Sequence, residues 1–366
     1  MQKIRLILVG GFLGAGKTTL LANAAARLIR QGRKVGIITN DQAAGLVDTE
    51  IVKRVSSGVG EVAGGCFCCR FGDLVSSLKR LLSDFTPDVV LAEPVGSCTD
   101  LSATVLQPLK KLYAEMLTVA PYSVLADPAR LREALTPGAP TLLPRTVHYI
   151  LRKQLEEADL IVLNKSDLLS KDEIAELEAL IAKCVSGRPI LAMSALRDKD
   201  VDLWLELTLH GTTGGTTITD VDYDTYTEGE AELGWLNATV DVQPAAGADI
   251  KGFCSKFLAT MQQELRAKCA DVAHLKVFVS NANESVTGNV TGLESEPLVR
   301  GRLRAGAAPL RLLVNARVHC APEELKSLVQ ECLSAVSGDK IAVKVTKVES
   351  FRPGRPQPTH RFHRVV

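Results

Sequence analysis

The sequence predicts an α/β protein, in which a doubly wound, mostly parallel sheet is followed by a smaller α+β domain. Three observations support this prediction. Short apolar runs alternate with helix-length segments through the first 200 residues, a glycine-rich segment follows the first run, and the composition changes after residue 210. Nearly continuous apolar runs are typical of parallel strands that are covered on both faces. A chain of 366 residues is long enough for two domains.

The expected strands of the first domain are 4–9, 34–39, 88–93, 122–127, 159–164 and 189–194. Helical patterns lie between them. Thr18–Arg30 ends before Gly32, and Asp172–Lys183 opens with acidic residues, which stabilise a helix N-terminus. Strands that alternate with helices indicate a doubly wound sheet.

The second half reads as a smaller domain of order βαββαβ. Its expected elements are strand Leu233–Val242, helix Ile250–His274, strand Leu275–Val279, strand Leu310–Val318, helix Pro322–Val336 and strand Ile341–Val348. This order is typical of a ferredoxin-like fold. We therefore expect a first domain over 1–208, a Gly/Thr/Asp-rich linker over 209–231, a ferredoxin-like domain over 232–350 and a flexible basic tail over 351–366.

Composition narrows the functional classes. The net charge is +1, so no global field favours nucleic acid or an anionic membrane as a partner. No stretch approaches the about 20 apolar residues of a membrane span. Nine cysteines, six of them scattered singly, fit reduced thiols in a cytoplasmic protein better than a disulfide framework.

The segment Gly11–Thr19, GFLGAGKTT, lies between an expected strand and an expected helix and has the spacing of a phosphate-binding P-loop. Its glycines allow backbone N–H groups to surround phosphates, Lys17 reaches the β- and γ-phosphates, and the Thr18 hydroxyl is available to Mg²⁺. The predicted nucleotide contacts here are Gly11, Gly14, Ala15, Gly16, Lys17, Thr18 and Thr19.

A second motif, Asn164-Lys165-x-Asp167, indicates that the base is guanine. The Asp167 carboxylate can accept hydrogen bonds from N1–H and the 2-amino group of guanine, whereas adenine would leave it unpaired. Ser194 and Ala195, which follow the next strand, are expected to support the guanine oxygen. The motifs together favour GTP over ATP.

Two acids at strand ends complete the expected hydrolytic site. Asp41 and Glu93 lie at the edge where open α/β sheets bind ligands, so each can reach Mg²⁺ or orient water. Lys17, Thr18, Asp41 and Glu93 form the expected catalytic group, with Thr18, Asp41 and Glu93 as Mg²⁺ ligands. The alternative is that the two acids are ordinary solvated residues at strand ends.

Three cysteines, Cys66, Cys68 and Cys69, lie within four positions of one another after two glycines. Thiolates bind soft divalent ions such as Zn²⁺ or Co²⁺, and three of them leave a tetrahedral ion one ligand short. Such an open shell suits an ion that is handed on. A cluster of buried or redox thiols is the alternative. Cys98 reads either as a buried structural cysteine or as a fourth ligand in one nucleotide state.

In the order of these motifs the chain resembles the CobW-like GTPases, the group of CobW, HypB, UreG and MeaB. The matching features are Gly11–Thr19, Asn40-Asp41, Asp48, the Gly65-Cys66-x-Cys68-Cys69 element, Glu93-x-x-Gly96 and the Asn164 motif. The resemblance implies a nucleotide-gated chaperone that delivers a metal ion to a client metalloenzyme or cofactor-dependent protein, with a homodimer left open. The alternatives are a chaperone for a cobalamin cofactor or its enzyme, and a non-catalytic GTP-binding adaptor.

Overall fold

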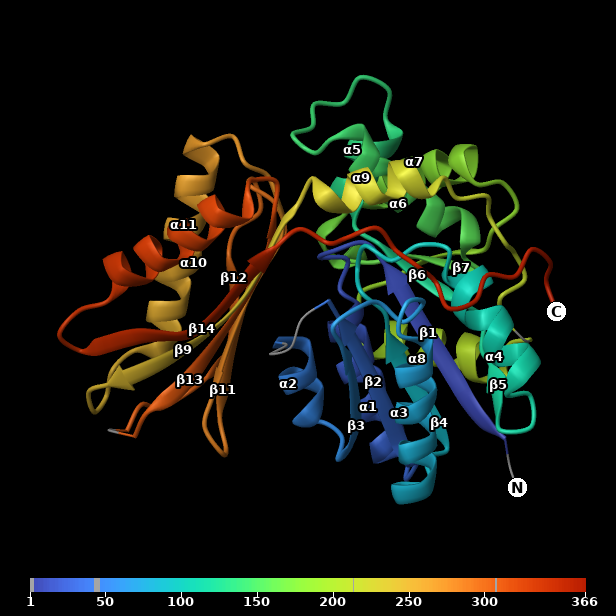
Figure 1. Cartoon of the computed structure of the whole chain (residues 1–366), viewed down its shortest axis with the longest axis horizontal. Helices are drawn as coiled ribbons and strands as arrows, with labels where there is room; N and C mark the ends of the chain where they lie inside the picture. The colour runs from blue at the N-terminus through green and yellow to red at the C-terminus, as the bar shows by residue number, and fades with distance from the viewer. Residues whose placement is uncertain (1–2, 43–46, 213, 307) are drawn as a thin grey trace.

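The structure is a computed structural model that describes residues 3–42, 47–212, 214–306 and 308–366. Residues 1–2, 43–46, 213 and 307 fall within the predicted domain ranges but lie outside the described residues. Two separate sheets lie side by side in Figure 1, a parallel one in the first half of the chain and an antiparallel one in the second. The predicted fold class is thereby confirmed. Among the described residues, no helix is both long and apolar enough to cross a membrane.

The first sheet is parallel, with strand order β3-β2-β4-β1-β6-β7-β8, and β5 also pairs with β1. Its elements are β1 (Ile4–Gly11), α1 (Lys17–Arg30), β2 (Val35–Asp41), α2 (Val47–Lys53), β3 (Gly58–Ala63), α3 (Phe71–Asp84), β4 (Val89–Glu93), a π-helical turn (Ser102–Leu106), α4 (Gln107–Leu112), β5 (Leu117–Val119), β6 (Ser123–Ala126), α5 (Pro128–Leu135), α6 (Arg145–Glu157), β7 (Leu160–Leu163), a 3₁₀ turn (Ser166–Leu168), α7 (Lys171–Cys184), β8 (Ile190–Ala192) and α8 (Asp198–His210).

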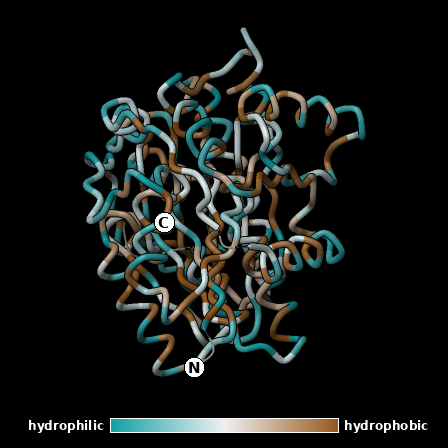
Figure 2. The backbone as a smooth tube through the Cα atoms, turned by 90° about the vertical axis from the view of Figure 1, so that its right-hand side faces the viewer, coloured by the Kyte–Doolittle hydropathy of each residue, from teal (hydrophilic) through white to brown (hydrophobic). Residues whose placement is uncertain are grey.

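Both faces of this sheet are buried, because successive side chains of a strand point to opposite faces. Ile7 and Val9 pack into the core formed with α1 and α8, whereas Leu6 and Leu8 pack into the core formed with α3 and α6. Hydrophobic segments accordingly run through the middle of the molecule in Figure 2, with hydrophilic turns around them. This arrangement leaves the carboxyl ends of the strands as the sheet edge where side chains can meet a ligand.

All six predicted strands of the first domain are present, within one or two residues of the expected ends. Sequence reasoning missed β3 and β5. β3 is an edge strand whose sequence GVGEVA has two glycines and is only half-buried, so it lacks the apolar run of a central strand. β5 has three residues, too few for a pattern.

The second sheet is antiparallel, with strand order β12-β11-β10-β13-β9-β14. Its elements are β9 (Gly234–Pro244), α10 (Ile250–Ala267), β10 (Val272–Ser280), β11 (Ser285–Val290), β12 (Leu298–Arg302), β13 (Leu310–Val318), α11 (Pro322–Val336) and β14 (Ile341–Phe351). The predicted βαββαβ order is present, with β11 and β12 added inside the polar insertion. α10 ends seven residues earlier than expected, because Cys269 has a left-handed backbone (φ 51°) and β10 begins directly afterwards.

The segments expected as a linker and as a flexible tail both make defined contacts with the first domain. The expected linker 209–231 contains helix α9 (Tyr223–Ala231), whose Tyr226 is buried in the core of the first domain. The tail after β14, expected to be flexible, lies across the first domain in Figure 1. It is held there by backbone donors, since Phe362 N–H donates to the carbonyl of Ala103 and Val366 N–H donates to Gln107.

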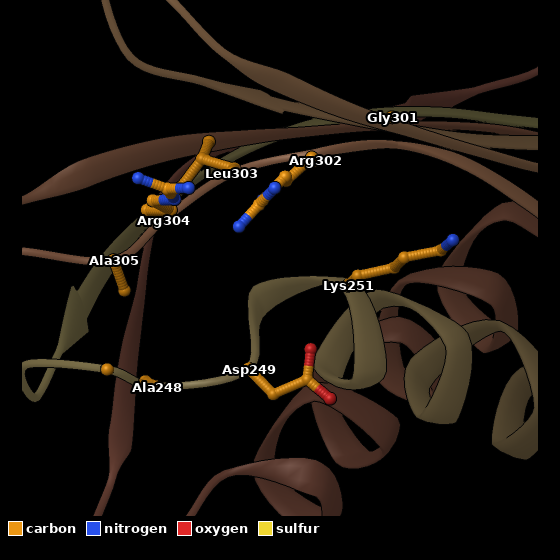
Figure 3. Close-up of a pocket in the computed structure, with 9 residues that line it drawn as sticks. Ala248, Asp249, Lys251, Gly301, Arg302, Leu303, Arg304 and Ala305 are labelled. Carbon is orange, nitrogen blue, oxygen red and sulfur yellow. The ribbon is translucent and has the colours of Figure 1, made fainter.

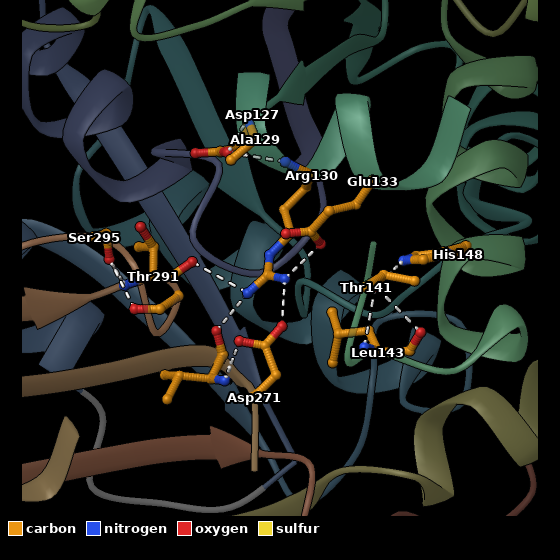
Figure 4. Close-up of polar contacts among 12 residues, drawn as sticks. Asp127, Ala129, Arg130, Glu133, Thr141, Leu143, His148, Asp271, Thr291 and Ser295 are labelled. Carbon is orange, nitrogen blue, oxygen red and sulfur yellow. Dashed lines mark hydrogen bonds and ion pairs between the residues drawn. The ribbon is translucent and has the colours of Figure 1, made fainter. Parts of the chain in front are cut away.

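A buried ion pair joins the two domains (Figure 4). The Arg130 guanidinium, on α5, lies 2.7 Å from the Asp271 carboxylate at the start of β10. Arg130 also donates to the backbone carbonyls of Val272 and Thr291, and it pairs with Glu133 of its own helix. Only 3% of the Arg130 side chain and 8% of the Asp271 side chain are exposed, so each charge depends on the other.

We predict that Arg130→Met destabilises the chain by about 3–5 kcal/mol, because it leaves Asp271 buried without a counter-charge. The matched control is Arg266→Met. Arg266 pairs with Glu294 at 3.6 Å with 54% and 91% of the two side chains exposed and also donates to the Leu293 carbonyl, and removing such contacts costs about 0–2 kcal/mol. Urea unfolding of the three proteins measures the difference. Equal unfolding midpoints for the two variants would contradict a linking role for Arg130.

Candidate functional site

The P-loop links β1 to α1 at the carboxyl edge of the first sheet. Gly16 precedes the helix with φ 100°, a left-handed conformation that favours glycine. A Cβ atom at Gly16 would lie 2.4 Å from Asn164 Nδ2, so the loop also needs glycine for space. Lys17 is buried, and its ammonium donates to the carbonyls of Gly11 and Phe12 across the loop. The loop therefore surrounds a positive charge at a helix N-terminus, which is an arrangement that suits phosphate.

Asn164 joins the P-loop to the predicted guanine-binding loops. Its side-chain amide donates to the Ala15 carbonyl at 2.8 Å, and its oxygen accepts from Ala195 N–H at 2.9 Å. Lys165 has a left-handed backbone and forms an ion pair with Asp127. Asp167, which follows, is exposed rather than buried, so its carboxylate is free to meet a base. The structure thus brings all of the predicted base-side residues to one edge.

The Thr18 hydroxyl lies between two carboxylates, 2.8 Å from Asp48 Oδ1 and 2.9 Å from Glu93 Oε1. The Thr18 hydroxyl has one proton, so it can donate a hydrogen bond to only one of the two carboxylates at a time. Burial and the nearby Asp48 charge raise the pKa of Glu93 to about 7, so Glu93 can itself carry the second proton. Glu93 Oε2 is buried without a hydrogen-bond partner among the described residues. These hard oxygens converge on Thr18, and this donor set fits Mg²⁺.

In the structure Asp48, rather than Asp41, lies beside Thr18, and the assignment of Asp41 as a Mg²⁺ ligand stays a prediction. Asp41 is held by Arg317 of β13, at 3.0 and 2.7 Å from its two oxygens. Asp48 is contacted by Lys276 of β10 at 2.7 Å. Both cations come from the second domain, more than 220 residues away in the chain. Sequence reasoning missed them, since no local pattern in β10 or β13 indicates a contact with another domain.

The thiol cluster, Cys66, Cys68 and Cys69, lies in the loop after β3. The Cys66 sulfur is 2.8 Å from that of Cys68 and 3.2 Å from that of Cys69, and the three could hold one metal ion. Asn40, at the end of β2, fixes this loop: its side-chain amide donates to the carbonyl of Gly65, and its oxygen accepts from Phe67 N–H. The end of β2 therefore carries two of these residues. Asn40 positions the loop of the thiol cluster, and Asp41 follows it.

A fourth thiol and a carboxylate lie next to the cluster. Hydrogen bonds from Cys68, Cys69 and Cys98 hold the pKa of Cys66 well below its usual range, which favours the thiolate at Cys66. Burial raises the pKa of Cys98 well above its usual range. Glu230, on α9, is also buried, and burial together with the charge of Cys66 raises its pKa to about 8. Its Oε2 has no hydrogen-bond partner among the described residues.

The loop that follows β4 runs from the Thr18 site to the thiol cluster. Glu93 at its start contacts Thr18, and Cys98, five residues later, helps to lower the pKa of Cys66 in the thiol cluster. Between them, Gly96 packs against the P-loop, since a Cβ atom there would lie 3.0 Å from Lys17 Nζ. The amide of Gln154 donates to the carbonyls of Gly96 and Cys98 and so fixes the second half of this loop. One short loop therefore runs from the Thr18 site to Cys98.

The C-terminal tail covers the thiol cluster. Thr359 N–H donates to the Cys68 carbonyl at 2.9 Å, and Gln357 N–H lies 3.1 Å from the Cys69 sulfur. His360 packs edge-on against Phe71 at the start of α3, with 5.0 Å between ring centres. The tail leaves Cys69 partly exposed, whereas Cys66 and Cys68 are buried. Access to the cluster therefore passes Cys69 and the tail.

A separate pocket of about 650 Å³ lies entirely within the second domain (Figure 3). Its walls come from the start of α10 and from β12, and Asp249, Lys251, Arg302 and Arg304 provide its charged groups. None of the predicted site residues lines it. The predicted chemistry lies at the P-loop and the thiol cluster instead.

Comparison with known proteins agrees with this geometry. The family model "CobW/HypB/UreG, nucleotide-binding domain" matches residues 5–192. The zinc chaperone CobW of Pseudomonas aeruginosa is 28% identical over 212 residues, which are 50% of this chain and 54% of that protein. The zinc-regulated GTPase metalloprotein activator 1 of Dictyostelium discoideum is 27% identical over 210 residues, which are 49% of this chain and 43% of that protein.

Among solved structures, Zn(II)-bound YjiA GTPase from E. coli is similar over 92% of this chain and all of that chain, with 14% identity and a TM-score of 0.36. The alignments span about half the length of the curated relatives. The family model, in contrast, covers more than half of the 366 residues and includes the P-loop, both acids of the Thr18 site, the thiol cluster and the Asn164 motif. The chain therefore belongs to the CobW/HypB/UreG family.

Proposed function

We propose that this protein is a GTP-hydrolysing metallochaperone, which binds a divalent metal ion through its thiol cluster and delivers it to a client protein. One observation carries the proposal. The single loop from Glu93 to Cys98 places a carboxylate at the Thr18 hydroxyl and a thiol that helps to lower the pKa of Cys66, so nucleotide and metal can influence each other. Known relatives are named zinc chaperones, which supports Zn²⁺ as the cargo, with Co²⁺ as the alternative.

The nucleotide side of the proposal uses the residues around the P-loop. Backbone N–H groups of the P-loop and the Lys17 ammonium bind the phosphates, and Asp167 selects guanine. Thr18, Asp48 and Glu93 hold Mg²⁺, directly or through water, and the ion supplies charge neutralisation for phosphoryl transfer. Asp41 is also a predicted Mg²⁺ ligand. It stays a candidate ligand in a state in which its ion pair with Arg317 is broken.

On the metal side, we propose that Cys66, Cys68, Cys69 and Cys98 form a four-thiol site. Four thiolates match the tetrahedral preference of Zn²⁺, and three of these sulfurs already lie within reach of one ion. Cys66 is the first to bind, because its lowered pKa favours the thiolate.

The two alternative functions predict different results. A chaperone for cobalamin would use the thiols only structurally, so purified protein would keep no thiol-dependent Zn²⁺ or Co²⁺. A non-catalytic adaptor would bind GTP without turnover. The nine cysteines are all free, which fits action in a reducing compartment such as the cytoplasm. The client is a metalloenzyme or a cofactor-dependent protein, and the second domain is the surface available to select it.

We predict that the protein binds GTP in clear preference to ATP and that Asp167→Ala removes this preference. The loss should be about 2–4 kcal/mol, because two hydrogen bonds to a charged acceptor disappear. The measurement is titration with both nucleotides. The matched control is Asp172→Ala, which removes an exposed carboxylate five residues away. Equal affinity of the wild-type protein for GTP and ATP would contradict the guanine assignment.

We predict that Cys98→Ser weakens Zn²⁺ binding by at least about tenfold, since ligand and near-ligand changes have effects of this size. Competition against a chelator measures the affinity. Cys254→Ser is the matched control, because Cys254 is equally buried but lies in α10 of the second domain. An unchanged affinity in Cys98→Ser would exclude Cys98 as a ligand. Full binding after loss of Cys66, Cys68 and Cys69 would exclude the thiol cluster itself.

A further inference from the structure

Lys276 of the second domain reaches into the nucleotide site of the first. Its ammonium lies 2.7 Å from Asp48 Oδ1 and 2.9 Å from Oδ2, and Asp48 in turn contacts the Thr18 hydroxyl. The pKa of Lys276 is raised, because the charges of Asp48 and Glu93 outweigh its burial, so it carries its full charge here. A cation of the second domain thus neutralises the carboxylate that lies beside the proposed Mg²⁺ position.

The second domain also contacts other residues of α2, the helix that contains Asp48. Val47, at the start of α2, donates its N–H to the Asn315 side chain of β13 at 2.9 Å. Val47 and Ile51 also pack against Phe278 and Leu313 of the second sheet. α2 is therefore attached to the second domain by an ion pair, a hydrogen bond and an apolar contact, although it belongs to the first domain in sequence.

The P-loop is in contact with the second domain too. A Cβ atom at Gly14 would lie 2.9 Å from the Thr291 side chain and 3.2 Å from the Ala273 carbonyl. The neighbouring His274 is buried, and burial together with the charges of Lys276, Arg317 and Lys17 holds its pKa well below its usual range. The charge of Lys17 in the P-loop therefore affects the pKa of a residue of β10.

Two cations compete for one carboxylate in this arrangement. Mg²⁺ that enters with GTP is bound through Thr18 and the acids beside it, and Asp48 cannot give its full charge to both Mg²⁺ and Lys276. We propose that Lys276 is a nucleotide-sensing residue, which holds Asp48 in the present arrangement and gives it up when Mg²⁺ and GTP bind, so that nucleotide loading loosens the second domain from α2. This inference rests on the proposed GTP binding. It adds that the contact between Lys276 and α2 is the part of the molecule that responds to the nucleotide.

The first test is the Mg²⁺ dependence of binding a fluorescent, non-hydrolysable GTP analogue. Without the competing ammonium, Lys276→Met should reach half-maximal binding at a Mg²⁺ concentration about 5- to 150-fold lower than the wild type, the usual range of coupling between two sites. Lys276→Arg, which keeps the charge, should resemble the wild type. Lys268→Met is the matched control, because it removes a half-exposed ion pair with Glu324 in the same domain.

The second test needs no variant. Small-angle X-ray scattering of the wild-type protein should show a larger radius of gyration with Mg²⁺ and the GTP analogue than with GDP alone. An unchanged or higher Mg²⁺ requirement in Lys276→Met would overturn the proposal, and so would a radius of gyration that does not increase. Absence of GTP binding by the wild type would instead overturn the proposed function, so the two failures are distinguishable.

Discussion

The ion cluster around Thr18 is the interaction on which the rest of the structure depends. Two acids, Asp48 and Glu93, meet at one hydroxyl group in a largely buried place, with Lys276 paired to Asp48 and the charge of Lys17 close by. Each of these charges is costly to bury alone, so the four residues stabilise one another. Because Lys276 comes from the second sheet, the same cluster also fixes how the two domains pack. The proposed release of Asp48 by Lys276 on nucleotide binding would act on that packing.

The thiol cluster depends on the same sheet edge. Asn40, the residue before Asp41 at the end of β2, holds the loop that carries the cysteines through two hydrogen bonds. Glu93 ends the neighbouring strand, and the chain continues from it to Cys98. The thiols therefore have two rigid connections to the nucleotide side, one through each strand. The tail adds a third element, since its backbone lies against Cys68 and Cys69. A metal ion at this place would be enclosed by parts of the chain that are far apart in sequence.

Much of the first domain could be predicted from sequence because its signals are local. Buried parallel strands have apolar runs, and the P-loop has a fixed spacing between a strand and a helix. β3 lacked this signal, since two glycines and Glu61 interrupt it at the edge of the sheet. The contacts of Asp48 with Lys276 and of Asp41 with Arg317 could not be predicted, because they depend on how two domains pack. The order of the tail has the same origin, since a segment rich in Pro and Arg becomes fixed only through its partners.

The central claim is that the thiol cluster and the nucleotide site are coupled through the loop from Glu93 to Cys98. The most direct measurement is the Zn²⁺ affinity of the wild-type protein, obtained by competition against a chelator with either GDP or a non-hydrolysable GTP analogue bound. We expect the two affinities to differ by about 5- to 150-fold, and linkage requires Zn²⁺ to change the relative affinity for the two nucleotides by the same factor. Identical Zn²⁺ affinities in the two nucleotide states would contradict the account.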